Sequence, residues 1–401
     1  MSNHQATSEL RIILLALALS MGAAISLGLA RFAYGLLLPV MRADLGWSYA
    51  LAGAMNTANA VGYLLGALIT PLLMRRYAPA RVMMAGALAA CVFMGLSGCF
   101  VTVMPWLALR LLAGVASALA FIGGGLLAAR IGSQHPKRSG FLIGLYYGGS
   151  GLGIVASALL APVVLRLAGP APHGWTWAWW ALAIVCVLAT IVLAWPARVL
   201  DSGHAAAAPA EGHAPPFHPR PLAYALSGYL MFGVGYIGYM TFVIALLREQ
   251  GAGGPAITLF YSLLGLAVVG SSRLWSGLLD KHHDGRPMAI LNALLGVATI
   301  LPALTASWPA MLLSGVLFGA VFLSVVASTT ALVRHNLPGA QWPAGIGAFT
   351  IIFAAGQIIG PLAVGWISDG PGGLERGLIV SALALWLGAL LATRQKALAR
   401  T

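Results

Sequence analysis

The chain consists of long apolar segments that follow one another with only short polar breaks between them. Twelve segments can be traced, at residues 12–40, 48–74, 81–103, 105–131, 140–168, 175–197, 221–249, 256–279, 286–306, 308–335, 342–369 and 374–393. A bilayer core of about 30 Å is crossed by roughly 20 apolar helical residues. Because a helix satisfies its backbone hydrogen bonds internally, the pattern predicts an all-α membrane protein with twelve transmembrane helices.

The composition excludes a water-soluble domain. Apolar residues make up 60% of the chain and charged residues only 8%, whereas soluble domains carry about 25% charged residues. A formal net charge of +13 would suit a nucleic acid, but the basic residues lie in short loops between apolar segments. That distribution is typical of membrane topology signals, so we expect the lipid bilayer, and no nucleic acid, as the partner.

The longest polar break divides the twelve segments six and six. It runs from Leu200 to Arg220 and is rich in Ala, Pro and His. We therefore expect an N-terminal six-helix bundle at 1–199, a cytoplasmic linker at 200–220 and a C-terminal six-helix bundle at 221–401.

The basic residues also predict the orientation of the helices. If the N-terminus is cytoplasmic, fifteen Lys and Arg residues lie on the inner side. Four lie on the outer side, namely Arg42, Arg166, Arg248 and Arg376. Positive residues concentrate in cytoplasmic loops, so both termini are expected in the cytoplasm.

Several stretches resemble the major facilitator superfamily. Leu37–Leu68 (LLPVMRADLGWSYALAGAMNTANAVGYLLGAL) looks like its first outer loop and second helix, and Gly277–Pro287 (GLLDKHHDGRP) like its cytoplasmic loop motif. Arg110–Ala118 (RLLAGVASA) resembles its R-x-x-x-G helix, and Gly356–Gly365 (GQIIGPLAVG) its G-x-x-x-G-P element. More narrowly, Gly28–Met41 (GLARFAYGLLLPVM) resembles the YbfB/YjiJ-type branch of bacterial facilitators.

The resemblance implies the major facilitator fold, a multi-pass protein of the bacterial inner membrane and transport by alternating access. Because the pathway of such a transporter runs within one chain, a monomer is expected, and no cofactor or metal is implied. Residues that match the motifs are expected to act in gating or structure, together with Arg273: these are Arg110, Gly114, Arg273, Asp280, Lys281, Gly285 and Arg286. The equivalent first-half loop, Gly66–Met83, lacks the acid and the second Gly of the motif.

Three arginines lie inside the predicted spans, and no acid accompanies them: Arg31, Arg110 and Arg273. An ionised group in hydrocarbon costs roughly 2.5–3.5 kcal/mol on insertion scales. A guanidinium can grip a carboxylate, sulfonate or phosphate group with two hydrogen bonds, so Arg31 is a candidate anion-binding group. The alternative is a structural Arg31 bonded to carbonyl groups of a neighbouring glycine-rich helix.

The other two arginines have structural readings of their own. The resemblance implies that Arg110 is buried against the first helix, where it acts either in gating or in packing. Arg273 lies near the inner end of its segment, from which it can extend to the interface, and a structural role is favoured there.

Polar and aromatic residues recur at helical spacing on three segments, so each set shares one helix face. They are Asn56, Asn59, Tyr63 and Gly66 on segment two, Tyr229, Phe232, Tyr236 and Tyr239 on segment seven, and Thr350, Phe353 and Gln357 on segment eleven. Such stripes serve either packing or a wet cavity. The predicted substrate-binding residues are Arg31, Tyr34, Asn56, Asn59, Tyr63, Tyr236, Tyr239 and Gln357.

Together these features predict a secondary transporter of a small organic molecule, anionic or amphipathic. Uptake of an anion against an inside-negative potential of 100 mV costs about 2.3 kcal/mol per charge, and no membrane-embedded carboxylate is present to carry a proton. Export or exchange is therefore favoured, with a coupling proton or a counter-anion left open. The alternative is proton-coupled multidrug efflux. A membrane enzyme or scaffold is a remote alternative, because no catalytic constellation occurs in the sequence.

Overall fold

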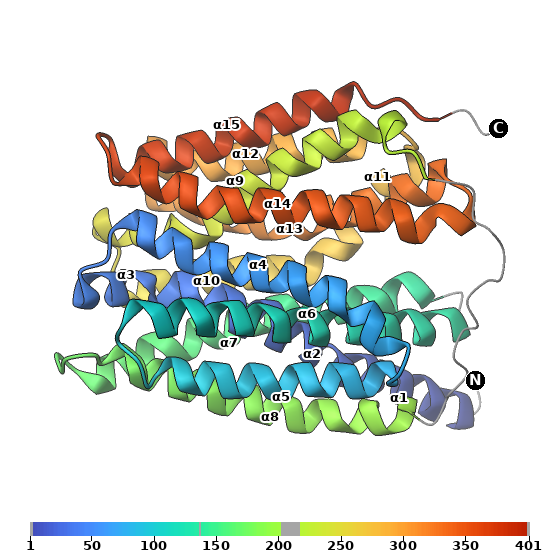
Figure 1. The fold of residues 1–401 in the computed structure, drawn as a ribbon, viewed down its shortest axis with the longest axis horizontal. Coiled ribbons are helices and arrows are strands. Elements are labelled where there is room, and N and C mark those ends of the chain that lie inside the picture. Colours follow the sequence, from blue (N-terminus) through green and yellow to red (C-terminus); the bar gives the residue numbers. More distant parts are fainter. Residues whose placement is uncertain (1–2, 136–137, 202–216, 399–401) are drawn as a thin grey trace. The chain divides into compact units, whose positions relative to one another are not determined.

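The computed structural model describes residues 3–135, 138–201 and 217–398, and all regular elements in these ranges are helices (Figure 1). Twelve helical spans in the described part of the chain are long and apolar enough to cross a membrane. The predicted all-α membrane fold with twelve spans is therefore confirmed. Residues 202–216, the greater part of the predicted linker, lie outside the described residues.

The first span, Leu10–Leu45, is a composite of four consecutive helices. These are α1 (Asn3–Leu19), α2 (Met21–Ala23), η1 (Ala24–Phe32) and α3 (Ala33–Leu45). The next five spans are α4 (Tyr49–Met74), α5 (Pro79–Ser97), α6 (Val103–Gln134), α7 (Ser139–Ala168) and α8 (Trp175–Asp201). The later helices are η3 (Arg220–Leu222), α9 (Ala223–Glu249), α10 (Gly254–Leu274), α11 (Ser276–Lys281), α12 (Arg286–Leu304), α13 (Trp308–Asn336), η4 (Gly339–Gln341), α14 (Trp342–Ser368) and α15 (Gly373–Thr393).

The eighth span is shorter than predicted. The sequence predicts one helix over 256–279, but α10 ends at Leu274 and α11 begins at Ser276. Between them Trp275 leaves the helical backbone region, with φ −107° and ψ 0°. Its indole Nε1 donates a hydrogen bond to the carbonyl of Ala320 at 2.8 Å. This bond, which hydropathy does not report, accompanies the break in the helix.

The middle of the first span is a nine-residue π-helix, η1. At its end the amide of Ala33 donates to the carbonyl of Gly28, five residues earlier. Turns with this i→i+5 hydrogen bond are rare in proteins, and many of those that occur lie at functional sites. Arg31 lies within η1 and is buried, so the helix with the unusual geometry also carries the candidate anion-binding residue.

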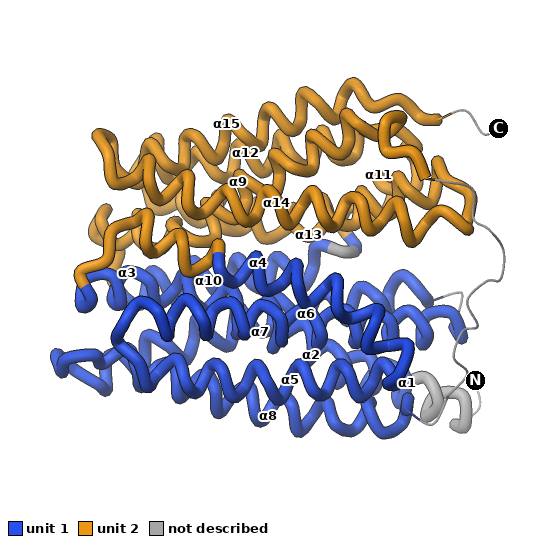
Figure 2. Tube along the Cα trace, viewed as in Figure 1, with its two compact units in different colours: residues 1–45, 58–204, 254–273 blue, residues 46–57, 205–253, 274–401 orange. Residues whose placement is uncertain are grey.

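The described helices form two compact units (Figure 2). Unit 1 holds residues 1–45, 58–204 and 254–273, and unit 2 holds residues 46–57, 205–253 and 274–401. The units thus group α10 with the first six spans, and the first turns of α4 with the last ones. The division into bundles at 1–199 and 221–401 stays a prediction.

Within unit 1, η1 packs against α6 and α7, and α5 packs against α6 and α8. Gly28 of η1 and Gly153 of α7 bring the two backbones together, because a Cβ on Gly153 would lie 2.8 Å from the Cα of Gly28. Small residues are the common means by which membrane helices approach closely. The result is a tightly enclosed η1.

Within unit 2, α9 is the central helix and packs against α12, α14 and α15. The first turn of α4 joins this unit through Asp369, which follows α14. The carboxylate of Asp369 accepts hydrogen bonds from the amides of Tyr49 at 2.7 Å and Ala50 at 2.8 Å. At the N-terminus of a helix the first amides have no acceptor within the helix itself. Asp369 supplies that acceptor for α4, and its negative charge is stabilising at this helix end.

Candidate functional site

The η1 helix is fixed in unit 1 by side-chain hydrogen bonds from two neighbouring helices. Ser26 and Ser117 of α6 bond reciprocally, each hydroxyl donating to the other residue's carbonyl, at 2.7 and 3.1 Å. From α10, the hydroxyl of Tyr261 donates to the carbonyl of Phe32 at 2.8 Å. These contacts bracket Arg31 on both sides along the helix, so its backbone position is held firmly.

The guanidinium of Arg31 is buried but not satisfied. Arg31 is only 3% exposed, and its Nη2 atom has no hydrogen-bond partner among the described residues. Its guanidinium carbon lies 5.6 Å from the ring centroid of Tyr63 on α4. A buried polar group without a partner costs free energy, and in native proteins each such group calls for an explanation.

Arg110 and Gly114 hold α6 against two other helices. Nη1 of Arg110 donates to the carbonyl of Ala30 in η1 at 2.8 Å, so Arg110 is buried against the first span as the resemblance implies. One turn later, a Cβ on Gly114 would lie 2.8 Å from the amide nitrogen of Tyr63 on α4. The R-x-x-x-G motif thus joins η1, α4 and α6.

Asn59, Tyr63 and Tyr34 surround these two arginines within unit 1. Nδ2 of Asn59 donates to the carbonyl of Arg110 at 3.0 Å, while Oδ1 of Asn59 is buried without a hydrogen-bond partner among the described residues. The ring centroid of Tyr34 lies 4.7 Å from the guanidinium carbon of Arg110. The predicted substrate contact of Tyr34 stays untested.

The other predicted substrate contacts lie in unit 2, where the stripes of α9 and α14 meet. Phe353 stacks on Tyr229 and Tyr236, with ring centroids 4.9 and 5.5 Å apart. Nε2 of Gln357 donates to the hydroxyl of Tyr236. Oε1 of Gln357 is buried and has no hydrogen-bond partner in the described part of the chain. The two stripes therefore form one aromatic cluster. Oε1 of Gln357 is left in it as a hydrogen-bond acceptor that a ligand can use.

Asn56 and Tyr239 are satisfied within unit 2. Nδ2 of Asn56 donates to the hydroxyl of Thr241 at 2.7 Å. The hydroxyls of Tyr239 and Ser314 are 2.7 Å apart, and Ser314 donates its own proton to the carbonyl of Ala298. Tyr239 is therefore the donor to Ser314. Both residues make structural hydrogen bonds, and their predicted substrate contacts stay untested.

Arg273 lies in the last turn of α10, which ends at Leu274. The sequence predicts it one to two turns before the inner end of its segment, and the break at Trp275 brings the end of the helix closer. The side chain is exposed, and its guanidinium carbon lies 4.7 Å from the ring centroid of Phe141. This stacking agrees with the structural reading of Arg273.

The loop between α11 and α12 docks on the end of α15. The amide of Gly285 donates to the carbonyl of Gln395 at 3.0 Å. Nε of Arg286 lies 3.3 Å from Asp284, an acid that the motif comparison does not single out. Asp280 and Lys281 end α11 on the approach to this contact. Since the Arg286 side chain is 69% exposed, its ion pair contributes little stability.

Sequence reasoning missed Tyr261, the Ser26–Ser117 pair and the capping role of Asp369. Each is an ordinary polar residue in or beside an apolar helix, and its importance comes from a partner far along the chain. No local pattern could have identified these contacts.

Three comparisons place the chain among known proteins. By fold it is similar to a mutant of the nucleoside transporter NupG, with a TM-score of 0.71 and 14% identity, over 94% of this chain and 98% of that one. It is also similar to a bacterial homolog of the human lysosomal transporter Spinster in an inward-facing, unoccupied conformation, with a TM-score of 0.68 and 14% identity over 95% of both chains. Likeness at this identity establishes the major facilitator fold.

Residues 23–393 match the family described as the uncharacterised MFS-type transporter YbfB, and the chain belongs to that family. A curated relative, the chloramphenicol resistance protein of Streptomyces lividans, is 25% identical over 377 residues, which are 90% of this chain and 92% of that protein. The protein is therefore a multi-pass membrane transporter of the major facilitator type that moves a small molecule. Its family and its structural neighbours are transporters rather than enzymes.

Proposed function

We propose that the protein carries a small organic anion, or an amphipathic molecule with an anionic group, across the bacterial inner membrane by alternating access. The observation that carries this proposal is the buried Nη2 atom of Arg31, which has no hydrogen-bond partner among the described residues. A substrate carboxylate, sulfonate or phosphate would supply the missing acceptor and the counter-charge.

The surroundings of Arg31 support an anion rather than a cation. The positive charge of Arg110 is close enough to interact with that of Arg31, and Asp and Glu residues occur only in tails, in loops or at span ends. Two neighbouring cations in a medium of low dielectric constant attract negative charge. The π-helix and its bracing bonds keep Arg31 in place before the substrate arrives.

The remaining contacts follow from the open hydrogen-bonding atoms. Asn59 Oδ1 and Gln357 Oε1 are both buried acceptors without a hydrogen-bond partner among the described residues. In unit 1 we assign Asn59 Oδ1 to a hydroxyl or amide donor of the substrate, with Tyr63 as a stacking surface. The substrate contacts predicted at Tyr34 and, in unit 2, at Asn56, Tyr236, Tyr239 and Gln357 stay predictions.

We further propose export or exchange as the direction, with both termini in the cytoplasm and a monomeric carrier. Entry of one negative charge against 100 mV costs about 2.3 kcal/mol, and export of an anion gains the same amount.

Proton-coupled drug efflux is the second candidate, and the similarity to a protein named for chloramphenicol resistance favours it. Its substrate would be neutral, and the buried charge of Arg31 would then act only through hydrogen bonding. The two candidates differ in whether the negative charge of the substrate matters.

A thermal-shift panel on the purified protein tests the proposal. Organic anions, neutral drugs including chloramphenicol, and organic cations are each added at high concentration, because stabilisation grows as RT ln(1 + [L]/Kd). Anions are expected to raise the melting temperature of the wild type and not of Arg31→Gln. If neutral drugs stabilise both proteins equally and anions stabilise neither, the anion proposal is wrong and drug efflux takes its place.

A further inference from the structure

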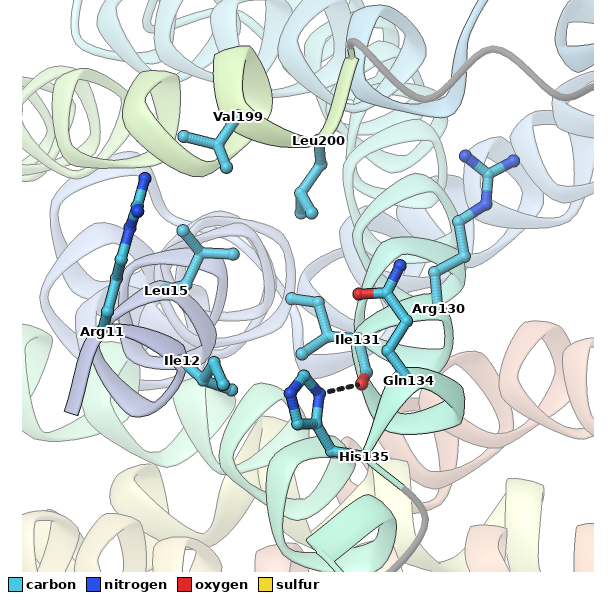
Figure 3. Close-up of a pocket in the computed structure, with 9 residues that line it drawn as sticks. All are labelled: Arg11, Ile12, Leu15, Arg130, Ile131, Gln134, His135, Val199 and Leu200. Atoms are coloured by element: carbon cyan, nitrogen blue, oxygen red, sulfur yellow. Dashed lines mark hydrogen bonds between the residues drawn. The ribbon is translucent and has the colours of Figure 1, made fainter. Parts of the chain in front are cut away.

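A cavity of about 390 Å³ lies within unit 1, and Arg31 is not among the residues that line it (Figure 3). Three helices line it: α1, α6 and the end of α8. No predicted substrate residue belongs to its lining, so the transport function proposed above does not account for it. Its lining residues are Arg11, Ile12, Leu15, Arg130, Ile131, Gln134, His135, Val199 and Leu200.

The cavity lies near the ends of membrane-spanning helices. Arg11 lies midway along α1, the first helix of span one, while Arg130 and Leu200 lie close to the ends of α6 and α8, at Gln134 and Asp201. The start of span one and the ends of spans four and six reach the same membrane surface. By the arginine count this surface is the cytoplasmic one.

The lining combines two arginine side chains with several apolar ones. Figure 3 shows Arg11 on one side of the cavity and Arg130 on the other, with apolar side chains between them. His135 directly follows α6, and its Nδ1 is 3.1 Å from the carbonyl oxygen of Ile131. Among the residues whose side chains the structure describes, no carboxylate lines the cavity, and Asp201, next to Leu200, pairs with Arg81 at 3.5 Å.

The face of α1 that points away from the cavity is apolar. Leu10, Leu14 and Leu17 recur at helical spacing on this face and are 58, 46 and 39% exposed. On α8, Ile191 is 63% exposed. In a membrane these side chains contact acyl chains, so lipid surrounds the helices that line the cavity.

We propose that this cavity binds an anionic phospholipid of the cytoplasmic leaflet. Its phosphate lies between Arg11 and Arg130, and its glycerol and proximal acyl carbons cover Ile12 and Leu15. Basic pockets between membrane helices on the cytoplasmic side recognise acidic headgroups. A free inorganic anion would leave the apolar floor exposed to water, and a zwitterionic lipid would leave the arginine charges unbalanced.

The test counts phospholipids bound to the detergent-purified protein by native mass spectrometry, with phosphatidylglycerol, phosphatidylcholine and inorganic phosphate as separate probes. Phosphatidylglycerol is expected to bind the wild type, and Arg11→Gln with Arg130→Gln to bind it about 25-fold more weakly, about fivefold for each arginine. The matched control replaces Arg75 and Arg198, two exposed arginines expected at the same surface but outside the cavity, by Gln. Ile12→Trp keeps every charge, fills the cavity and is expected to weaken binding as well.

The outcomes separate the sources of the ligand. If the control pair loses as much phosphatidylglycerol as the cavity pair, binding follows surface charge and the site is refuted. Equal binding of phosphatidylcholine, or tight binding of inorganic phosphate alone, also overturns the assignment. Normal binding in Ile12→Trp would show that the lipid lies elsewhere.

Discussion

Replacing Arg31 by Met should change the stability of the ligand-free protein little, although the side chain is buried. An unpartnered buried polar atom costs about 1–3 kcal/mol, and the cation–π contact with Tyr63 contributes about 0.5–2 kcal/mol in the opposite direction. The net effect on the free energy of unfolding therefore lies between about 1 kcal/mol destabilising and about 2.5 kcal/mol stabilising. Met is unbranched like Arg, although shorter, and removes the charge that the empty site cannot pair.

Arg110→Met is the matched control, since Arg110 is an equally buried guanidinium in the same unit. It loses the 2.8 Å bond to the carbonyl of Ala30 and the contact with the Tyr34 ring. Each of the two guanidinium groups keeps one buried N–H nitrogen without a hydrogen bond among the described residues and makes one ring contact. A hydrogen bond to a charged group contributes about 1.5–3 kcal/mol, so Arg110→Met should be less stable than Arg31→Met by this amount.

The assay is the free energy of unfolding of both purified variants in a denaturant titration, without substrate. The two variants should differ by about 1.5–3 kcal/mol, the contribution of the bond to Ala30, with Arg31→Met the more stable. If Arg31→Met loses as much stability as Arg110→Met, the guanidinium of Arg31 is satisfied in the empty protein, and the reasoning from its open Nη2 atom fails.

Three further predictions concern packing, capping and orientation. Gly114→Ala should lower the stability measured by thermal unfolding by about 1–3 kcal/mol, because the added Cβ meets the α4 backbone. Gly140→Ala, where a Cβ meets nothing within 4 Å, should leave the stability unchanged. Equal effects of the two substitutions would contradict this packing. Asp369→Ala should lower the free energy of unfolding by about 1 kcal/mol through the lost α4 cap, and Asn in its place should retain part of it; an unchanged stability in the Ala variant would argue against the cap. In a background without native cysteines, Arg376→Cys should react with a membrane-impermeant thiol reagent in intact cells and Arg75→Cys should not; the reverse result would invert the topology.

The twelve spans could be predicted because hydropathy is a local property of the sequence. Two segments end more than a helical turn later in the prediction than in the structure: the third runs six residues past Ser97, where α5 ends, and the eighth runs past Trp275, whose indole bonds to Ala320. The stripes on α9 and α14 were also predictable. Both helices are regular, so residues three or four apart on each one share a face, as Tyr236 does with its neighbours on α9 and Gln357 with its neighbours on α14.

The environment of the arginines was predictable only in part. The placement of Arg110 against the first span followed from the motif, but the pairing of Arg31 with Tyr63 did not. The contact of Tyr34 with Arg110 was not predicted either, because it joins α3 and α6 through residues far apart in the sequence. Asn56 and Asn59 share a face of α4, yet one bonds to Thr241 and the other to the carbonyl of Arg110.

The most direct measurement is a cycle that removes the charge of Arg31 and the charge of the ligand in turn. An anion that stabilises the wild type is compared by calorimetry with its neutral amide, on the wild type and on Arg31→Gln. If Arg31 binds the anionic group, losing either charge weakens binding by about 2–3 kcal/mol, roughly 30- to 150-fold, and losing both costs little more than losing one. Additive losses, or an unchanged affinity of the anion for Arg31→Gln, would contradict the account.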